Sequence, residues 1–244
     1  MTKDKDLKDK VILVTGASRG IGYAAALEAA ARGAHIVAVA RTTGGLEELD
    51  DEIVALGGST TLVPFDLKDG EGIDLLGKAI FDRWGKLDGM IVNAALLGVI
   101  SPLPHIAPDE FAKVMEINVI APFRLVRSMD VLLRASDAGR VVFVSSSSAN
   151  SARPYWGLYA ASKAALNAMA KSYGGELAQT NVKVNVFYPG AVRTSMRAKA
   201  VPGEDPMTLP APSEIVPKLV DLVSPNLAES GQIFDIRTDK FTPI

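Results

Sequence analysis

The chain has 244 residues, a length that fits one domain with a single large core. Hydrophobic residues make up 48% and charged residues 22%, which excludes an intrinsically disordered or fibrous protein. The 26 Lys and Arg residues face 28 Asp and Glu residues, and no basic block is long enough to follow a phosphate backbone. Nucleic acid is therefore not an expected partner.

Cysteine is absent, and only two histidines, His35 and His105, are present. Disulfides, thiol nucleophiles and cysteine-bound zinc are thereby excluded, and no metal site is expected. We place His35 at the start of a strand and His105 in a loop, both without a catalytic role. The charged start, residues 1–10, precedes no apolar segment of signal-peptide length, and no stretch reaches the roughly 18 apolar residues of a membrane helix. We expect a cytoplasmic protein without a membrane segment.

Short β-branched runs alternate along the chain with longer segments of helical periodicity. In chain order, the expected strands are Val11–Thr15, His35–Ala40, Thr60–Phe65, Gly89–Val92, Arg140–Ser145, Val182–Phe187 and Gln232–Ile236. Between them, helices are expected over Ile21–Ala31, Leu46–Leu56, Gly72–Trp84, Pro108–Leu133, Trp156–Gln179 and Ser213–Val223. Such alternation with apolar strands is typical of a parallel sheet covered on both faces. The predicted fold class is α/β: a single-domain, doubly wound sandwich over residues 1–244 with a seven-stranded parallel sheet.

Residues 195–212 break this rhythm, because they contain four prolines, a glycine and a Glu-Asp pair. Loops of this length often close over a binding site, so we predict a substrate lid at about 195–212. In an open parallel sheet, ligands bind outside the carboxyl ends of the strands. The functional residues should therefore directly follow the strands.

A glycine-rich segment, Thr15–Gly22, joins the first strand to an alanine-rich helix. Glycines allow a tight turn and the close approach of a pyrophosphate, and the helix N-terminus offers free N–H groups. A glycine pattern alone also fits a turn without a ligand, but the strand before it and the helix after it favour a Rossmann-type phosphate site. The expected cofactor-binding residues of this loop are Gly16, Ser18, Arg19, Gly20, Ile21 and Gly22.

The second strand ends in Arg41, where an NAD-specific fold would place an acid that accepts a hydrogen bond from the ribose 2′-OH. Arg19 and Arg41 can instead flank the ribose, and guanidinium groups suit a phosphate dianion. The sequence thus favours NADP(H) over NAD(H). The alternative is that both arginines are only solvated.

Tyr159 and Lys163 are four residues apart in a helical pattern, so both side chains lie on one face. A phenol has a pKa of about 10, and a nearby ammonium would lower it toward a value suited to proton exchange. Such a pair is often structural, but its place after the fifth strand favours catalysis.

Ser146, at the end of that strand, would donate to a substrate carbonyl oxygen. It stands in a run of four serines, of which Ser145 and Ser147 would point the other way in an extended strand.

Taken in order, these motifs resemble the short-chain dehydrogenase/reductase family over essentially the whole chain. The resemblance rests on Thr15–Gly22, Asp66-Leu67, Asn93-Ala94-Ala95, Asn118, Ser146, Tyr159-x-x-x-Lys163 and the segment Pro189–Thr194. The stretch 196–212 looks like that of an NADP-preferring bacterial subgroup of oxidoreductases, and it names no substrate.

The resemblance also implies roles for single residues. Asn118 would hold a water that extends a proton relay from Lys163 to solvent, and Lys163 would also hold the nicotinamide ribose. Asp66 would contact the adenine amino group or only cap the following turn. Further cofactor-binding residues implied by the family are Leu67, Asn93, Ala94, Ala95, Pro189, Gly190, Val192 and Thr194. Ala95 departs from the family pattern, which usually has glycine there, and its methyl group would face the cofactor.

The function indicated is an NADP(H)-dependent carbonyl reductase or alcohol dehydrogenase acting on a small molecule, with Tyr159 as the acid/base. Leu96, Leu97, residues 149–156 and the lid would line an apolar or mixed substrate pocket. Arg153 would meet an anionic group only if it points inward, and an exposed position is expected for it. The resemblance further implies a homodimer or homotetramer with helix faces and the strand 231–236 at its interfaces.

Two other classes of protein are weaker alternatives. A non-catalytic NADP-binding regulatory protein would use the same phosphate loop but need not retain the serine, tyrosine and lysine. A nucleotide-sugar epimerase or dehydratase shares the Tyr-x-x-x-Lys pair. Those chains resemble a longer branch of the superfamily, however, and here only about 55 residues follow Pro189.

Overall fold

A computed structural model describes residues 5–244; the first four residues of the charged start lie outside the described part. The eight strands form one sheet in the order β3-β2-β1-β4-β5-β6-β7-β8. They are β1 (Val11–Thr15), β2 (His35–Ala40), β3 (Ser59–Pro64), β4 (Gly89–Val92), β5 (Arg140–Val144), β6 (Lys183–Tyr188), β7 (Gln232–Asp235) and β8 (Lys240–Pro243). The predicted α/β doubly wound architecture is confirmed.

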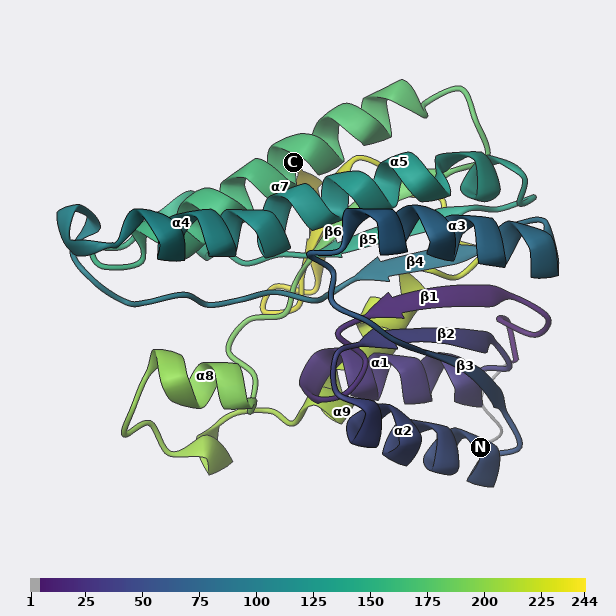
Figure 1. Cartoon of the computed structure of the whole chain (residues 1–244), viewed down its shortest axis with the longest axis horizontal. Coiled ribbons are helices and arrows are strands. Elements are labelled where there is room, and N and C mark those ends of the chain that lie inside the picture. Colours follow the sequence, from purple (N-terminus) through teal and green to yellow (C-terminus); the bar gives the residue numbers. More distant parts are fainter. Residues whose placement is uncertain (1–4) are drawn as a thin grey trace.

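Helices cover both faces of the sheet (Figure 1). The helices are α1 (Gly20–Ala31), α2 (Thr43–Ala55), α3 (Gly70–Trp84), α4 (Pro108–Met115), α5 (Ala121–Arg134), α6 (Ser148–Ser151), α7 (Gly157–Glu176), α8 (Ser195–Ala200) and α9 (Pro212–Asp221). In Figure 1, α3, α4, α5 and α7 lie above the sheet, and α1, α2 and α9 lie below it. Within residues 5–244, no helix has the length and apolar character needed to cross a membrane.

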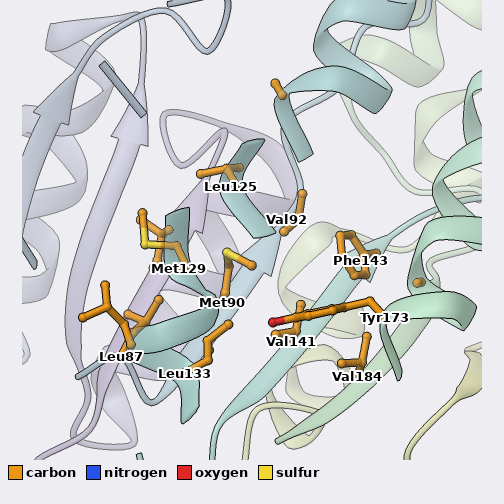
Figure 2. Packing of buried hydrophobic residues seen from close by; sticks show 14 of the residues in the cluster. Leu87, Met90, Val92, Leu125, Met129, Leu133, Val141, Phe143, Tyr173 and Val184 are labelled. Carbon is orange, nitrogen blue, oxygen red and sulfur yellow. The ribbon is translucent and has the colours of Figure 1, made fainter. Parts of the chain in front are cut away.

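Alternate residues of each strand enter the two halves of the core, as the period of a β-strand requires. On β1, Val11 and Leu13 pack with the helices above the sheet, whereas Ile12 and Val14 pack with those below it. Figure 2 shows the upper half, where side chains from β4, β5 and β6 meet those of α5 and α7. Because its central strands β1, β4 and β5 are buried on both faces, the sheet is a rigid support for the loops at its edge.

The prediction of seven strands is wrong by one. The first seven strands pair in parallel, but β8 adds an antiparallel edge strand to β7. The turn that connects the two strands contains Asp239 with a φ of 52°. The rings of Phe234 on β7 and Phe241 on β8 lie 5.1 Å apart in an edge-to-face contact. This turn has none of the Asn-Gly or Asp-Gly sequences that announce a hairpin, so the sequence carried no signal for it.

The predicted helix over residues 108–133 is divided in two. A π-helical segment, Glu116–Ile120, separates α4 from α5 and turns Asn118 into the interior. Single π-turns inside helices often occur at functional sites. The predicted lid over 195–212 also contains structure, namely α8 and a 3₁₀ turn over Pro206–Thr208.

The strand order reverses between β1 and β4: β1 pairs with β2 on one side and with β4 on the other. The loops that follow β1 and β4 therefore leave the carboxyl edge of the sheet toward opposite faces, which makes this the topological switch point of the sheet. In Figure 1 this edge lies to the left, between α4 above and α8 below. A ligand site is expected at this edge.

Candidate active site

A cleft of about 580 Å³ opens at the carboxyl edge of the sheet. It is bordered by the loops after β1, β2, β3, β4, β5 and β6 and by α8. Of the predicted site residues, those that line it are Gly16, Ser18, Arg19, Gly20, Ile21, Arg41, Asp66, Leu67, Asn93, Ala94, Ala95, Ser146, Tyr159, Lys163, Pro189, Gly190, Val192 and Thr194. Gly22 and Asn118 lie behind the surface of the cleft.

Two positions of the glycine-rich loop, Gly16 and Gly22, have no room for a side chain unless neighbouring atoms shift. Gly16 has a φ of +69°, and a Cβ there would lie 2.9 Å from the side chain of Asn93. A Cβ on Gly22 would lie 2.3 Å from the carbonyl oxygen of Gly16. The loop therefore packs tightly against the start of α1, which has no side-chain cap and no acid in its first turn. Its N–H groups are free to bind an anion.

Asn93 fastens this loop to the end of β4. Its Nδ2 donates to the carbonyl oxygen of Thr15 at 3.0 Å, and its backbone N–H donates to Thr15 Oγ1 at 3.0 Å. The N–H of Ala94 donates to the same hydroxyl at 3.1 Å. Asn93 therefore braces the loop, and Ala94 and Ala95 continue along the floor of the cleft.

Three cations surround the end of the cleft beside β2 and β3. Arg41 lies 3.8 Å from Asp66 between Nη1 and Oδ2, and both side chains are largely exposed to solvent. Asp66 also accepts from the N–H of Lys68 at 3.1 Å, which is the turn-capping role left open by the sequence. Arg19 and Lys68 line the same end, and neither forms an ion pair with another described residue. The arrangement offers guanidinium and ammonium groups to a phosphate.

Tyr159 and Lys163 lie one turn apart on α7 and face the cleft together. Lys163 Nζ donates to the carbonyl oxygen of Val144 at 2.8 Å and lies 5.7 Å from the centre of the Tyr159 ring. Burial raises the pKa of the Tyr159 phenol to about 12, whereas the Ser146 hydroxyl acts in the opposite direction. Burial lowers the pKa of Lys163 to about 8. The lowering of the Tyr159 pKa that was expected from Lys163 is therefore not found: burial dominates, and Ser146 is the group that opposes it.

The structure separates the members of the serine run. Ser146 Oγ accepts from the N–H of Ser148 at 3.1 Å, which leaves its own hydrogen to be donated toward Tyr159 and the cleft. Ser145 is buried, and its hydroxyl turns toward the backbone of α7, with Oγ 3.5 Å from the carbonyl oxygen of Lys163. Ser146 is therefore the serine positioned to act beside Tyr159.

Asn118 is 1% exposed rather than solvated. Its Oδ1 accepts from the N–H of Leu96 at 2.8 Å, and its Nδ2 donates to the Leu96 carbonyl oxygen at 2.8 Å and to Ser162 Oγ at 2.9 Å. It thus ties the segment after β4 to α7. The π-helical segment is what directs this side chain inward, and the sequence pattern did not predict it.

The segment after β6 contains α8, at the start of the stretch for which a lid was predicted. Thr194 Oγ1 accepts from the N–H of Arg197 at 3.2 Å and caps α8. Arg197 forms a two-pronged ion pair with Glu204, with both contacts at 2.6 Å, which joins α8 to the loop that follows it. Met196, Lys199 and Ala200 of α8 line the cleft.

The substrate end of the cleft contains the expected apolar residues and some unexpected cations. Leu96, Leu97 and Trp156 line it, and the Trp156 and Tyr159 rings lie 6.2 Å apart at 69°. Arg153 lines it as well. Three cationic residues that were not predicted for the cleft also line it: Lys113, Arg237 and, at the end beside β2 and β3, Lys68. Their helix and loop positions are typical of solvated lysine and arginine, so no sequence signal distinguished them.

Neither histidine lines the cleft. His35 lies at the start of β2, with Nδ1 2.8 Å from Ser59 Oγ and its ring 5.1 Å from that of Trp84. Among residues 5–244, no group of three or more potential metal ligands is found.

The fold and the cleft together define a Rossmann-type nucleotide-binding protein with a tyrosine and a lysine beside the phosphate loop. The model of the short chain dehydrogenase family matches residues 10–205. The chain therefore belongs to the short-chain dehydrogenase family of oxidoreductases.

Similar proteins of known sequence and structure agree with this placement. Oxidoreductase YciK of Escherichia coli K12 is 38% identical over 233 residues, covering 94% of this chain and 92% of YciK. A short chain dehydrogenase from Shigella flexneri, solved with NADP, has 38% identity and a TM-score of 0.92 over 96% of this chain and 100% of its own. One from Escherichia coli CFT073, solved with NADPH, has 38% identity and a TM-score of 0.91 over 95% of this chain and 98% of its own.

Proposed function

We propose that this protein is an NADP(H)-dependent oxidoreductase that transfers a hydride between the cofactor and the carbon of a carbonyl or alcohol substrate. The observation that carries the proposal is the meeting of Ser146, Tyr159 and Lys163 in one cleft with the free N-terminus of α1. A phosphate site and a proton-donating group are thus joined at the switch point of the sheet.

The cleft suits a dinucleotide with a phosphate on its adenosine ribose. The tight backbone cradle at Gly16 and Gly22 and the uncapped α1 N-terminus suit the pyrophosphate. Arg19 and Arg41, with Lys68 beside them, suit the 2′-phosphate. The two similar proteins solved with NADP and NADPH support the same choice. By family resemblance, Val192 and Thr194 would hold the carboxamide at the other end.

When bound, NADPH supplies the hydride that attacks the carbonyl carbon. Tyr159 gives its hydroxyl proton to the substrate oxygen, and Ser146 donates a hydrogen bond that holds this oxygen in place. Lys163, fixed by the Val144 carbonyl, provides the positive charge that stabilises the phenolate left behind. In the reverse direction, Tyr159 accepts the proton of the alcohol.

The proton of Tyr159 is replaced along a path through Lys163 and toward Asn118. One lone pair of Asn118 Oδ1 is used by Leu96, and an amide oxygen has two, so the second is free to hold a water. Asn118 also keeps the segment after β4 in place against α7. In this proposal it is a positioning residue.

Nothing in the structure favours a non-catalytic NADP-binding protein. A regulator needs only the phosphate loop, whereas here Ser146 is also held with its proton facing the cleft beside Tyr159.

We further propose a homodimer or homotetramer. The helix α5 and the π-helical segment before it expose Ile120, Phe123 and Val131, the last at 70%. These apolar residues suit a helix-to-helix interface, and β8 rather than β7 is the strand free at the sheet edge. Light scattering coupled to size exclusion should give two or four chains, and a monomer at micromolar concentration would contradict this proposal.

The function is tested by titrating the protein with NADPH and with NADH while following tryptophan fluorescence. Trp156 lines the cleft and reports on the bound cofactor. The proposal predicts that NADPH binds about tenfold more tightly or better, a difference of about 1.4 kcal/mol. It also predicts that NADPH is consumed when a panel of ketones and aldehydes is added. No binding of either cofactor, or binding without turnover of any carbonyl compound, would contradict it.

A further inference from the structure

We infer that the substrate carries an anionic group, a carboxylate or a phosphate, which Arg153 and Lys199 bind at the outer rim of the cleft with help from Lys113. This inference rests on the proposed function and adds a substrate class to it. The three side chains come from different elements: Lys113 from α4, Arg153 from the loop before α7, and Lys199 from α8. In Figure 1, α4 lies above and α8 below the left edge of the sheet, where the strands end.

The cleft is strongly basic although the chain as a whole has a net charge of −2. Among residues 5–244, Asp66 is the only acid that lines it. The cations that line it are Arg19, Arg41, Lys68, Lys113, Arg153, Lys163, Arg197, Lys199 and Arg237. The local excess of positive charge does not follow from the overall composition of the chain. It is suited to binding more than one anionic group.

Six of these cations already have another role. Arg19, Arg41 and Lys68 lie at the adenosine end, and Lys163 is buried beside Tyr159. Arg197 is paired with Glu204, and Arg237 is paired with Asp235 at 2.5 Å between Nη2 and Oδ2.

The remaining three cations are largely unneutralised. Within the described part of the chain, Arg153 and Lys199 form no ion pair or side-chain hydrogen bond. Lys113 has only an exposed contact with Glu110 at 3.3 Å, and pairs of that kind contribute little. Cations that converge on a cleft without acids of their own are suited to an anionic ligand.

Apolar side chains line the same cleft. They are Leu96, Leu97, Trp156 and, from α8, Met196. The arrangement fits a ketone or aldehyde with an apolar body that places its carbonyl at Tyr159 and its anionic group at the rim. In the reducing direction, the carbonyl carbon gains a hydride from NADPH and its oxygen gains a proton from Tyr159. The products are a hydroxy acid or hydroxyalkyl phosphate and NADP⁺.

The test uses three ketones of one shape: 4-acetylbenzoate, 4-acetylphenyl phosphate and the neutral methyl 4-acetylbenzoate. Each is titrated by calorimetry into protein saturated with NADP⁺, so that the adenosine phosphate site is already filled. The two anions should bind about tenfold more tightly than the ester, which is the effect of two or three exposed ion pairs. The tighter of the two anions identifies the group as a carboxylate or a phosphate. Because salt screens ion pairs, a salt concentration of about 0.5 M should reduce the difference in Kd between the anions and the ester.

Variants separate the rim from general charge effects. Arg153→Gln and Lys199→Gln should each reduce the preference for the anions about threefold, and Arg153→Lys should restore part of it. Lys8→Gln is the matched control, because this exposed lysine precedes β1 at the opposite edge of the sheet. It should leave the preference intact.

The inference is overturned if the ester binds as tightly as the anions, if neither anion binds, or if the rim variants keep the full preference. Its failure is distinguishable from that of the proposed function. Tight NADPH binding with turnover of neutral ketones alone would retain the oxidoreductase and remove the anionic substrate. Absence of NADPH binding would instead remove the proposed function itself.

Discussion

Removal of the Arg41 side chain should weaken the binding of NADPH and leave the binding of NADH nearly unchanged. Arg41 is 61% exposed and lies 3.8 Å from Asp66. An exposed pair of this length contributes at most about 1 kcal/mol. The guanidinium is therefore free to turn from Asp66 to a 2′-phosphate at little cost.

The expected magnitude follows from this geometry. A hydrogen bond to a charged group contributes about 1.5–3 kcal/mol, and the exposure of Arg41 places it at the low end of that range. A loss of about 1.5 kcal/mol corresponds to a roughly tenfold weaker Kd for NADPH. NADH has no phosphate at that position, so Arg41→Ala should change its Kd by less than about twofold.

The assay is the fluorescence titration with both cofactors at one fixed salt concentration, since phosphate contacts are sensitive to screening. Arg127→Ala is a suitable control, because Arg127 is an exposed arginine of α5 that does not line the cleft. An equal loss for NADPH and NADH would refute the reasoning, and so would an unchanged Kd for NADPH.

Two further predictions concern the acid/base pair and the stability of the fold. Because burial lowers the pKa of Lys163 to about 8, its ammonium loses charge as the pH rises through that value. The kcat/KM for carbonyl reduction should therefore fall above about pH 8, whereas a profile level to about pH 10 would contradict the role of this charge. Asp88, 2% exposed, accepts from Ser136 Oγ at 2.7 Å and from the Val11 N–H at 3.0 Å. Asp88→Ala should lower the free energy of unfolding in urea by about 3 kcal/mol, and a loss under about 1 kcal/mol would contradict this account.

The sheet and the phosphate loop could be predicted because their causes are local. Continuous apolar runs such as Val11–Thr15 predict strands that are buried on both faces. The glycines of the loop after β1 stand where backbone must approach backbone, which is a property of the residue itself. Tyr159 and Lys163 share a helix face by spacing alone.

Features that depend on tertiary packing were not predictable in the same way. The π-helical segment that turns Asn118 inward has no local signal, because a helix of residues 108–133 satisfies the same periodicity. The partners of Asn93 and Asn118 are backbone and hydroxyl groups from distant segments. The antiparallel strand β8 depends on the contact of Phe234 with Phe241 across a turn without a typical sequence.

The sequence also did not predict which cations line the cleft. A lysine on an exposed helix, such as Lys113, is most often solvated, and the spacing of residues along the sequence does not indicate that it faces a ligand site. Only the convergence of α4, α8 and the loop before α7 shows that Lys113, Arg153 and Lys199 line one cleft.

Comparison of the Tyr159→Phe variant with the parent protein tests the central claim most directly. The substitution removes the hydroxyl that donates the proton and keeps the ring that packs against Trp156. With any carbonyl substrate that the parent protein reduces, the account predicts an NADPH Kd within about twofold of the parent and a kcat lowered by at least about 10³, the scale of a lost general acid. Turnover close to that of the parent protein would contradict Tyr159 as the acid/base and, with it, the mechanism derived from this cleft.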